Sequence, residues 1–289
     1  MDVVVVGGGS WGTAFSRLLA DHGHAVTLAC RDGAQVEEIA RTGHNPRYLP
    51  GVDLDGVAVA TISHASVEAA NLVVVAVPSA AFAEVVAALP GRAPILSLTK
   101  GLDPGTGDRL STLVRDRPVA VLSGPNVADE IARGLPAAAV IACESLPLAV
   151  QLQLAITSSA FRVYVNDDVL GVELCAAAKN VIALAAGGAD GLRLGDNAKA
   201  ALVARGLAEM RRLAEVAGAR PESANSTLLD DSQPRSNTRS DSLANVCATG
   251  VGTATAIRLT RAARGAGSCR RCSWAGRRET RCTSGACRR

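Results

Sequence analysis

The chain has 289 residues, a formal net charge of +3 at pH 7 and a hydrophobic share of 48%, values typical of a globular protein with two domains. The longest apolar region, residues 71–90, is interrupted by Pro78 and Glu84, so we expect no membrane-spanning helix there. The residues after Met1 have the pattern of a buried strand rather than of a signal peptide, and we therefore expect a cytoplasmic location.

Residues 2–32 contain, in chain order, an apolar strand, a glycine-rich turn, an amphipathic helix and a second apolar strand, which is the start of a parallel β-α-β unit. The turn has the spacing G-x-G-x-x-G. Gly7 permits a tight turn, Gly9 lets the backbone approach a pyrophosphate, and Gly12 lets the helix pack closely. Because a helix N-terminus attracts anions, this pattern predicts dinucleotide binding. A purely structural glycine turn is the alternative.

The choice of dinucleotide is expected to depend on the end of the second strand, about 20 residues beyond the turn. An acidic residue there favours NAD, whereas an arginine accommodates the 2′-phosphate of NADP. This chain has Arg31 followed by Asp32. Arg31 favours NADPH, and Asp32 leaves the use of NADH open.

Further apolar strands alternate with helical patterns and are expected at residues 56–61, 71–78, 93–101, 118–125 and 137–144. Strands that are apolar throughout predict a sheet covered on both faces. We therefore expect an α/β fold in which residues 1–165 form a dinucleotide-binding domain with a Rossmann-type, doubly wound parallel sheet.

Residues 166–221 are expected to form the first part of an all-helical second domain. An apolar helix is predicted from about residue 170 to residue 186, where a pair of glycines, Gly187 and Gly188, ends it. A second helix is predicted from about residue 196, where Asp and Asn are good N-caps, to Gly218.

Lys179 lies in the middle of the first of these helices, and only three lysines occur in the chain. The residues three and four positions away on the same face are all apolar: Cys175, Ala176, Ile182 and Ala183. If this face is buried, the ammonium must face a polar cavity. Loss of solvation would then lower its pKa toward the working pH, so that it could donate or accept a proton. The alternative is a helix face that is open to solvent.

Lys100, Gly124 and Asn126 follow directly after two of the predicted strands. In open parallel sheets, ligands bind at the carboxyl ends of the strands. These residues are therefore candidates for a ligand site, and a solvated loop lysine is the alternative interpretation of Lys100.

Several segments together resemble the bacterial type of NAD(P)-dependent glycerol-3-phosphate dehydrogenase over residues 2–221. They include "GGGSWGTAF", "NPRYLP", "LTKGL", "SGPNVADEIARGLP", "AAAKNVIA" and "GDNAKAALVARGLAEM". The resemblance implies that NADPH or NADH reduces dihydroxyacetone phosphate to sn-glycerol 3-phosphate, a precursor of phospholipids. It also allows a homodimer.

The resemblance implies roles for individual residues. Ser10, Trp11 and Arg31 match cofactor contacts, and Ala128 matches a position near the nicotinamide. Lys100 matches a residue that touches both cofactor and substrate, and Lys179 matches the lysine of acid–base catalysis. Gly124 and Asn126 match the substrate loop, where serine or threonine is more usual than asparagine.

Residues 222–289 break this pattern, with 12 arginines against 5 acidic residues and with five of the eight cysteines. We expect a basic tail that is truncated relative to the family or disordered. The abrupt change resembles a reading-frame shift near codon 222. The "GLGDL" and "SRNR" segments, which the resemblance assigns to the substrate site, are absent. The second hypothesis is therefore a protein that binds cofactor but is catalytically impaired.

Two further interpretations of the tail are weaker. Four of its cysteines could form a zinc site, namely Cys269, Cys272, Cys282 and Cys287. Its arginines, which lack interleaved aromatic residues, could bind nucleic acid without specificity. We expect neither a metal nor a nucleic acid as a ligand.

Overall fold

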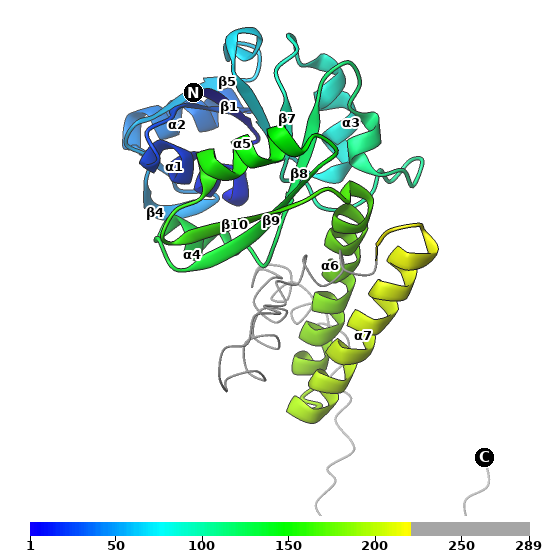
Figure 1. Cartoon of the computed structure of the whole chain (residues 1–289). Helices are drawn as coiled ribbons and strands as arrows, with labels where there is room; N and C mark the ends of the chain where they lie inside the picture. Colours follow the sequence, from blue (N-terminus) through cyan, green and yellow to red (C-terminus); the bar gives the residue numbers. More distant parts are fainter. Residues whose placement is uncertain (221–289) are drawn as a thin grey trace, which may run out of the picture.

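The structure is a computed structural model that describes residues 1–220 (Figure 1). The predicted tail, with its zinc and nucleic-acid alternatives, lies outside the described residues. The elements in chain order are β1 (Asp2–Val6), α1 (Ser10–Asp21), β2 (Ala25–Cys30), α2 (Gly33–Thr42), β3 (His44–Asn45), β4 (Leu49–Asp53), β5 (Val57–Thr61), η1 (Val67–Ala69), β6 (Leu72–Val75), α3 (Ser79–Ala88), β7 (Ile95–Ser97), η2 (Leu110–Leu113), β8 (Val119–Ser123), α4 (Ala128–Ala132), β9 (Ala137–Cys143), α5 (Leu146–Ile156), β10 (Phe161–Asn166), α6 (Val169–Gly191) and α7 (Asp196–Val216).

The main sheet has eight strands in the order β10-β9-β8-β7-β6-β1-β2-β5, and β3 and β4 form a separate hairpin. All neighbouring strands of the main sheet are parallel except β8 and β9, which are antiparallel. The predicted Rossmann-type parallel sheet is confirmed, and it contains one antiparallel pair that the sequence did not predict. The short helix α4 packs against α1 and does not cross the face of the sheet. Strand β9 therefore begins at the end of the sheet where β8 finishes, and it runs back antiparallel to β8.

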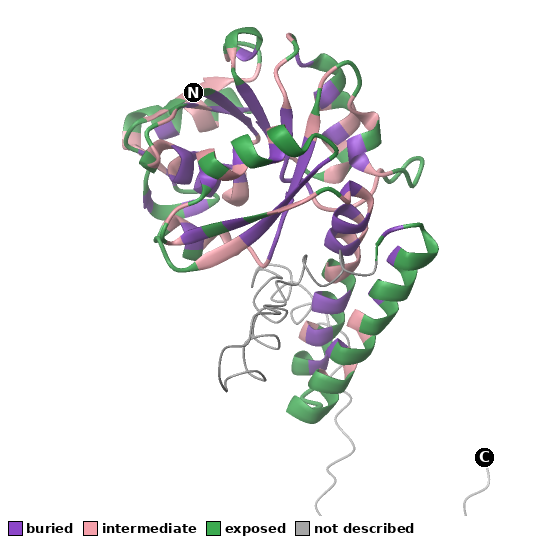
Figure 2. Ribbon diagram, viewed as in Figure 1, coloured by how far each residue is buried: buried purple, intermediate pink, exposed green. Residues whose placement is uncertain are grey.

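Both faces of the sheet are covered, as predicted. Strand β1 shows this directly, because Val3 and Val5 belong to one core cluster while Val4 and Val6 belong to another. Side chains alternate between the two faces of a strand, so a run of valines supplies both cores. Helices α1 and α5 cover the first face and α3 the second, and the central strands are almost wholly buried (Figure 2).

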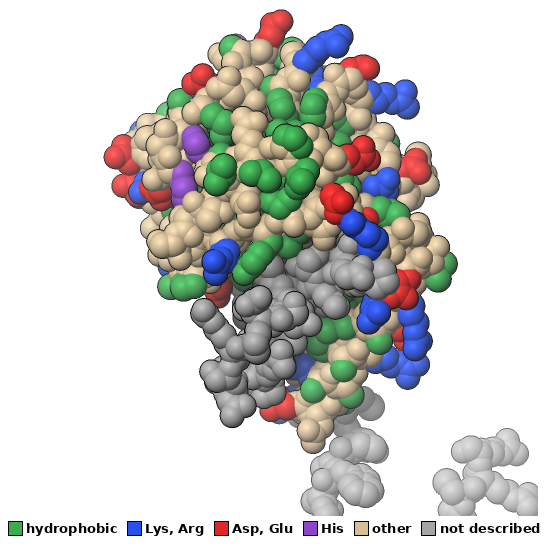
Figure 3. Space-filling view, in the orientation of Figure 1, with side chains coloured by type: hydrophobic (Ala, Val, Ile, Leu, Met, Phe, Trp, Pro, Cys, Tyr) green, Lys and Arg blue, Asp and Glu red, His purple; other side chains and the backbone are tan. Residues whose placement is uncertain are grey.

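Helix α5 leaves one apolar face open. Leu146, Val150 and Leu154 repeat every four residues and are 56%, 39% and 77% exposed, and Figure 3 shows apolar side chains gathered over this helix. The other side of α5 is the one that contributes to the core, through Ala149, Leu152 and Ile156.

Helix α6 is longer than predicted. It begins at Val169, where the Asp168 side chain accepts a hydrogen bond from the Gly171 amide, and it continues through Gly187 and Gly188 to Gly191. Each glycine costs a helix about 1 kcal/mol relative to alanine. Packing of α6 along α7 outweighs this cost. The prediction that the helix ends at Gly187 and Gly188 is therefore wrong.

Among the described residues, α6 is also the one helix that is long and apolar enough to cross a membrane, with a mean hydropathy of 1.7. Half of its most apolar window is buried inside the protein. Its first two turns pack on the sheet, where Val169 and Val172 contact a cluster that includes Val121 and Val140. These contacts explain its apolar composition.

Candidate active site

The glycine turn lies between β1 and α1, and its glycines are needed for different reasons. Gly7 has a φ of +123°, and a Cβ there would lie 2.4 Å from the Ala76 oxygen. A Cβ on Gly12 would lie 2.0 Å from the Gly7 oxygen. Gly9 has no atom within 4 Å of the corresponding position, so the space above it is open. That is the arrangement expected if the backbone at Gly9 approaches a ligand.

Gly8, which was not among the predicted site residues, is buried in the turn. A Cβ on Gly8 would lie 2.4 Å from the Cys30 Sγ atom. Its carbonyl oxygen accepts hydrogen bonds from Gln35 Nε2 at 2.6 Å and from Asn45 Nδ2 at 3.0 Å. Asn45 is fully buried and also donates to Thr13 Oγ1 at 2.8 Å. Asn45 is the first residue of the segment "NPRYLP" quoted above. That segment was the part of the sequence that could have pointed to this contact.

The N-terminus of α1 is available to an anion. Its N-cap, Gly9, provides no side-chain hydrogen bond, and the first turn has no acidic residue. The first amides of a helix need partners and carry a partial positive charge. Ser10 Oγ donates to the Tyr48 oxygen at 2.6 Å, which places the β3–β4 hairpin beside the turn. Trp11 packs edge-on against Phe15, with ring centroids 5.4 Å apart.

Arg31 and Asp32 differ in what they contact at the end of β2. Asp32 caps α2, since its Oδ1 atom accepts a hydrogen bond from the Ala34 amide at 3.0 Å. The Arg31 side chain is exposed beside it. The carboxylate is therefore already engaged in the fold, whereas the guanidinium can reach a ligand.

The predicted substrate-loop residues and Lys179 lie together at the end of β8. Lys179 Nζ donates to Ser123 Oγ at 3.0 Å and to the Gly124 oxygen at 2.8 Å. The Asn126 amide donates to the same Gly124 oxygen at 2.9 Å. Lys179 thus faces polar groups although its helix is apolar. Ser123, fully buried, was not among the predicted residues.

Asn126 has one atom that lacks a partner. Its Nδ2 donates to the Ala138 oxygen at 3.1 Å, but its buried Oδ1 has no hydrogen bond within the described part of the chain. A Cβ on Gly124 would lie 2.6 Å from that same Ala138 oxygen, so the loop has no room for a larger residue. The loop at Gly124 is therefore packed closely against β9.

Ala128 lies on the cofactor side of this loop. It begins α4, and it packs with Trp11 against a small cluster that contains Ala14, Leu49 and Val52. The predicted position near the nicotinamide is therefore joined to the glycine turn through direct packing. The structure brings Ala128, Trp11 and the turn together, and Arg31 directly follows Cys30, the last residue of β2, which packs against Gly8 of the turn.

Lys100 follows β7, the strand next to β8, so it lies at the same edge of the sheet as Ser123. Burial lowers the pKa of Lys100 from 10.5 to about 8. Among residues 1–220, no hydrogen bond or ion pair is formed by its ammonium. A half-buried cation that has no partner among residues 1–220 is suited to an anionic ligand at this end of the sheet.

We expect Lys100→Met to raise the free energy of unfolding of the ligand-free chain by about 1–2 kcal/mol at about pH 7. The folded-state pKa of Lys100 is about 8 against 10.5 for an exposed lysine, so the folded chain holds this proton less tightly. The penalty is complete below about pH 8 and disappears as the pH rises toward about 10. Urea unfolding of both chains at about pH 7 and at about pH 10 would measure this gain in the free energy of unfolding. A gain that is equal at both would contradict the prediction.

A separate apolar groove of about 770 Å³ lies between α6 and α7 and is lined mainly by aliphatic side chains, among them Val181, Ile182 and Leu202. Lys179 is not part of its lining. We assign the chemistry to the polar edge of the sheet rather than to this groove, because phosphate and carbonyl groups need charged or hydrogen-bonding partners.

The fold and the glycine turn define a Rossmann-type dinucleotide-binding protein, and Lys179 reaches the end of β8 from helix α6. Family models agree with this class. The model described as NAD-dependent glycerol-3-phosphate dehydrogenase N-terminus matches residues 2–149, and the corresponding C-terminus model matches residues 168–231. The second match ends at residue 231, ten residues beyond residue 221, where the resemblance was expected to end.

Individual proteins are similar over most of the chain. Enzymes named glycerol-3-phosphate dehydrogenase [NAD(P)+] from Xanthomonas campestris and Stenotrophomonas maltophilia are each 45% identical over 230 residues, covering 76% of this chain and 67% of the relative. The crystal structure of glycerol-3-phosphate dehydrogenase from Coxiella burnetii has a TM-score of 0.75 at 35% identity, covering 89% of this chain and 83% of that one. The chain belongs to the NAD-dependent glycerol-3-phosphate dehydrogenase family. Its cofactor is NAD or NADP.

Proposed function

We propose that the protein reduces dihydroxyacetone phosphate to sn-glycerol 3-phosphate with NADPH or NADH, and so supplies a precursor of phospholipids. The observation that carries this proposal is the Lys179 ammonium, which α6 brings to Ser123 and Gly124 at the edge of the sheet that also holds the glycine turn. Membership of the family supports the same reaction.

The dinucleotide would bind along the turn and the end of β2. Gly7, Gly9 and Gly12 shape the turn, and the amides of Ser10 and Trp11 at the start of α1 would meet the pyrophosphate. When bound, the dinucleotide supplies the hydride. Arg31 would contact a 2′-phosphate, because its guanidinium is exposed while Asp32 is engaged in capping α2. We therefore propose a preference for NADPH.

Lys179 would act as the acid in reduction and as the base in the reverse direction. As the carbonyl carbon accepts a hydride, negative charge develops on its oxygen. An ammonium beside that oxygen stabilises the charge and donates the proton. Lys100 would contact both ligands and hold the polarised substrate by its charge. Gly124 and Asn126 would form the substrate loop, which the hydrogen bond from Asn126 Nδ2 to the Ala138 oxygen holds in place.

We also propose a division of labour along the chain. Residues 1–165 would bind the dinucleotide, and residues 166–221 would carry the catalytic lysine to it. The three described cysteines, Cys30, Cys143 and Cys175, are buried free thiols, which supports a reducing, cytoplasmic compartment. A homodimer is part of this proposal.

Oxidation of NADPH by the full chain, followed by the loss of nicotinamide absorbance, tests the reaction. Dihydroxyacetone phosphate should support oxidation, whereas dihydroxyacetone, which lacks the phosphate, should not. Because the sequence lacks "GLGDL" and "SRNR", we expect kcat/KM to be lower than that of an intact relative by about 10²- to 10⁴-fold, the value of one or two charge-assisted phosphate bonds. Cofactor binding without any substrate-dependent oxidation would instead support the second hypothesis, a catalytically impaired protein.

A further inference from the structure

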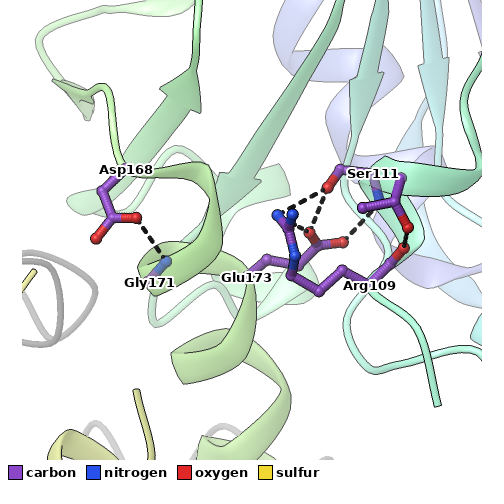
Figure 4. A network of polar contacts seen from close by, with 6 residues as sticks. Arg109, Ser111, Asp168, Gly171 and Glu173 are labelled. Carbon is purple, nitrogen blue, oxygen red and sulfur yellow. Dashed lines mark hydrogen bonds and ion pairs between the residues drawn. The ribbon is translucent and has the colours of Figure 1, made fainter. Parts of the chain in front are cut away.

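A buried carboxylate on α6 joins this helix to the nucleotide-binding domain. Glu173 is 2% exposed. Its Oε1 atom accepts a hydrogen bond from the Ser111 amide at 2.9 Å, and its Oε2 atom accepts one from Ser111 Oγ at 2.6 Å (Figure 4). Arg109 Nη1 lies 3.6 Å from the same Oε2 atom. Glu173 was not among the predicted site residues.

The partners of Glu173 offset its burial in part, and the net effect is a raised pKa of its carboxyl group. Burial raises the pKa of Glu173, while the two hydrogen bonds from Ser111 and the charge of Arg109 lower it. A buried carboxylate is tolerated only when its oxygens are matched in this way. Since Ser111 is 62 residues away along the chain, the contact fixes α6 against a distant element and not against its own neighbours.

The geometry relates this contact to Lys179. Ser111 lies in η2, which packs against both α3 and β8. Val172 and Lys179 are seven residues apart and so share a helix face. Val172 packs on β8 and β9, and Lys179 reaches the end of β8. Glu173 is one residue from Val172, about 100° around the helix, and about 9 Å along the axis from Lys179.

We propose that Glu173 is a positioning residue for Lys179. Its two carboxylate oxygens grip the amide and the hydroxyl of a single serine, and this arrangement defines both the rotation and the axial position of α6. A shift of one residue would move Glu173 by about 1.5 Å and turn it by about 100°, which breaks both hydrogen bonds. Apolar contacts alone do not define the helix setting as sharply, because they are non-directional.

The consequence for catalysis rests on the proposed function, but the positioning itself can be measured without turnover. The chain has three lysines, Lys100, Lys179 and Lys199. Full-length protein with ¹³C-labelled lysine therefore gives three sets of side-chain NMR signals, which single Lys→Met variants assign. Lys199 forms an ion pair with Asp190 at 2.7 Å in the α6–α7 region and serves as the internal reference.

We expect Glu173→Ala to shift or broaden the Lys179 ε-carbon signal and to leave that of Lys199 in place. Glu173→Gln should restore the Lys179 signal, because an amide can still accept from the Ser111 amide and donate to Ser111 Oγ. Glu144→Ala, which removes an exposed carboxylate from a surface hollow that Arg109 and Ser111 also line, should change neither signal. Binding of NADPH and a cooperative unfolding transition in each variant show that the fold is retained.

The proposal is overturned if the Lys179 signal is unchanged in a folded Glu173→Ala variant, or if the alanine and glutamine variants move it equally. Where the full chain shows turnover, we expect Glu173→Ala to lower kcat by about 10- to 100-fold with little change in the KM for NADPH, since a misplaced catalytic group loses rate rather than cofactor affinity. A Lys179 signal that depends on Glu173 in a chain without turnover would count against the proposed function and not against the positioning role.

Discussion

Replacing Lys179 with methionine is expected to reduce the oxidation of NADPH by dihydroxyacetone phosphate by at least about 10²-fold in kcat. Methionine keeps the apolar stem but removes the ammonium that donates to Ser123 and to the Gly124 oxygen. The developing negative charge on the substrate oxygen then loses its proton donor and the positive charge beside it, and only the charge of Lys100 remains. Steady-state or single-turnover rates with saturating NADPH would measure the loss.

The matched control is Lys199→Met, because Lys199 is a lysine of the next helix that is paired with Asp190. It should keep the rate of the unmodified chain. Lys179→Met should still bind NADPH, since the glycine turn is formed by β1 and α1. A Lys179→Met variant that keeps more than about a tenth of the rate would show that another group supplies the proton.

The main features of the fold could be predicted because each depends on local pattern. The valines of β1 follow one another without a polar residue, and this alone predicts a strand covered on both faces. The scarcity of lysine made Lys179 stand out, and its apolar neighbours indicated burial. The antiparallel entry of β9 and the continuation of α6 to Gly191 depend on tertiary packing, which outweighed the local signals.

The parts of the site that escaped prediction involve residues far apart in sequence. Gly8 is held by Asn45, which is 37 residues away, and Glu173 by Ser111, which is 62 residues away. Neither pairing leaves a periodic pattern in the chain. The glycine spacing identified where a pyrophosphate would approach, but it did not show which glycine is enclosed by the protein and which faces open space. That distinction comes from the structure and can be tested.

We expect Gly8→Ala and Gly9→Ala both to weaken NADPH binding, for different reasons. In Gly8→Ala the new Cβ lies 2.4 Å from Cys30 Sγ and 2.9 Å from Gln35 Nε2, so the turn and its hydrogen bonds must shift even without ligand. Such overpacking typically costs about 1–3 kcal/mol of stability. In Gly9→Ala the new Cβ meets no protein atom within 4 Å, so the stability of the ligand-free chain should hardly change.

The Gly9→Ala variant should nevertheless bind NADPH about 10- to 100-fold more weakly, because its methyl group occupies the space through which the pyrophosphate approaches the backbone. Thermal unfolding without ligand, together with NADPH titration by fluorescence, separates the two variants. Gly187→Ala lies inside α6 with open space around its Cβ and is the control, with unchanged affinity and a gain of up to about 1 kcal/mol in stability. Unchanged NADPH affinity in Gly9→Ala would mean that the cofactor does not approach the turn at this residue, and the proposed site would have to be rebuilt around another contact.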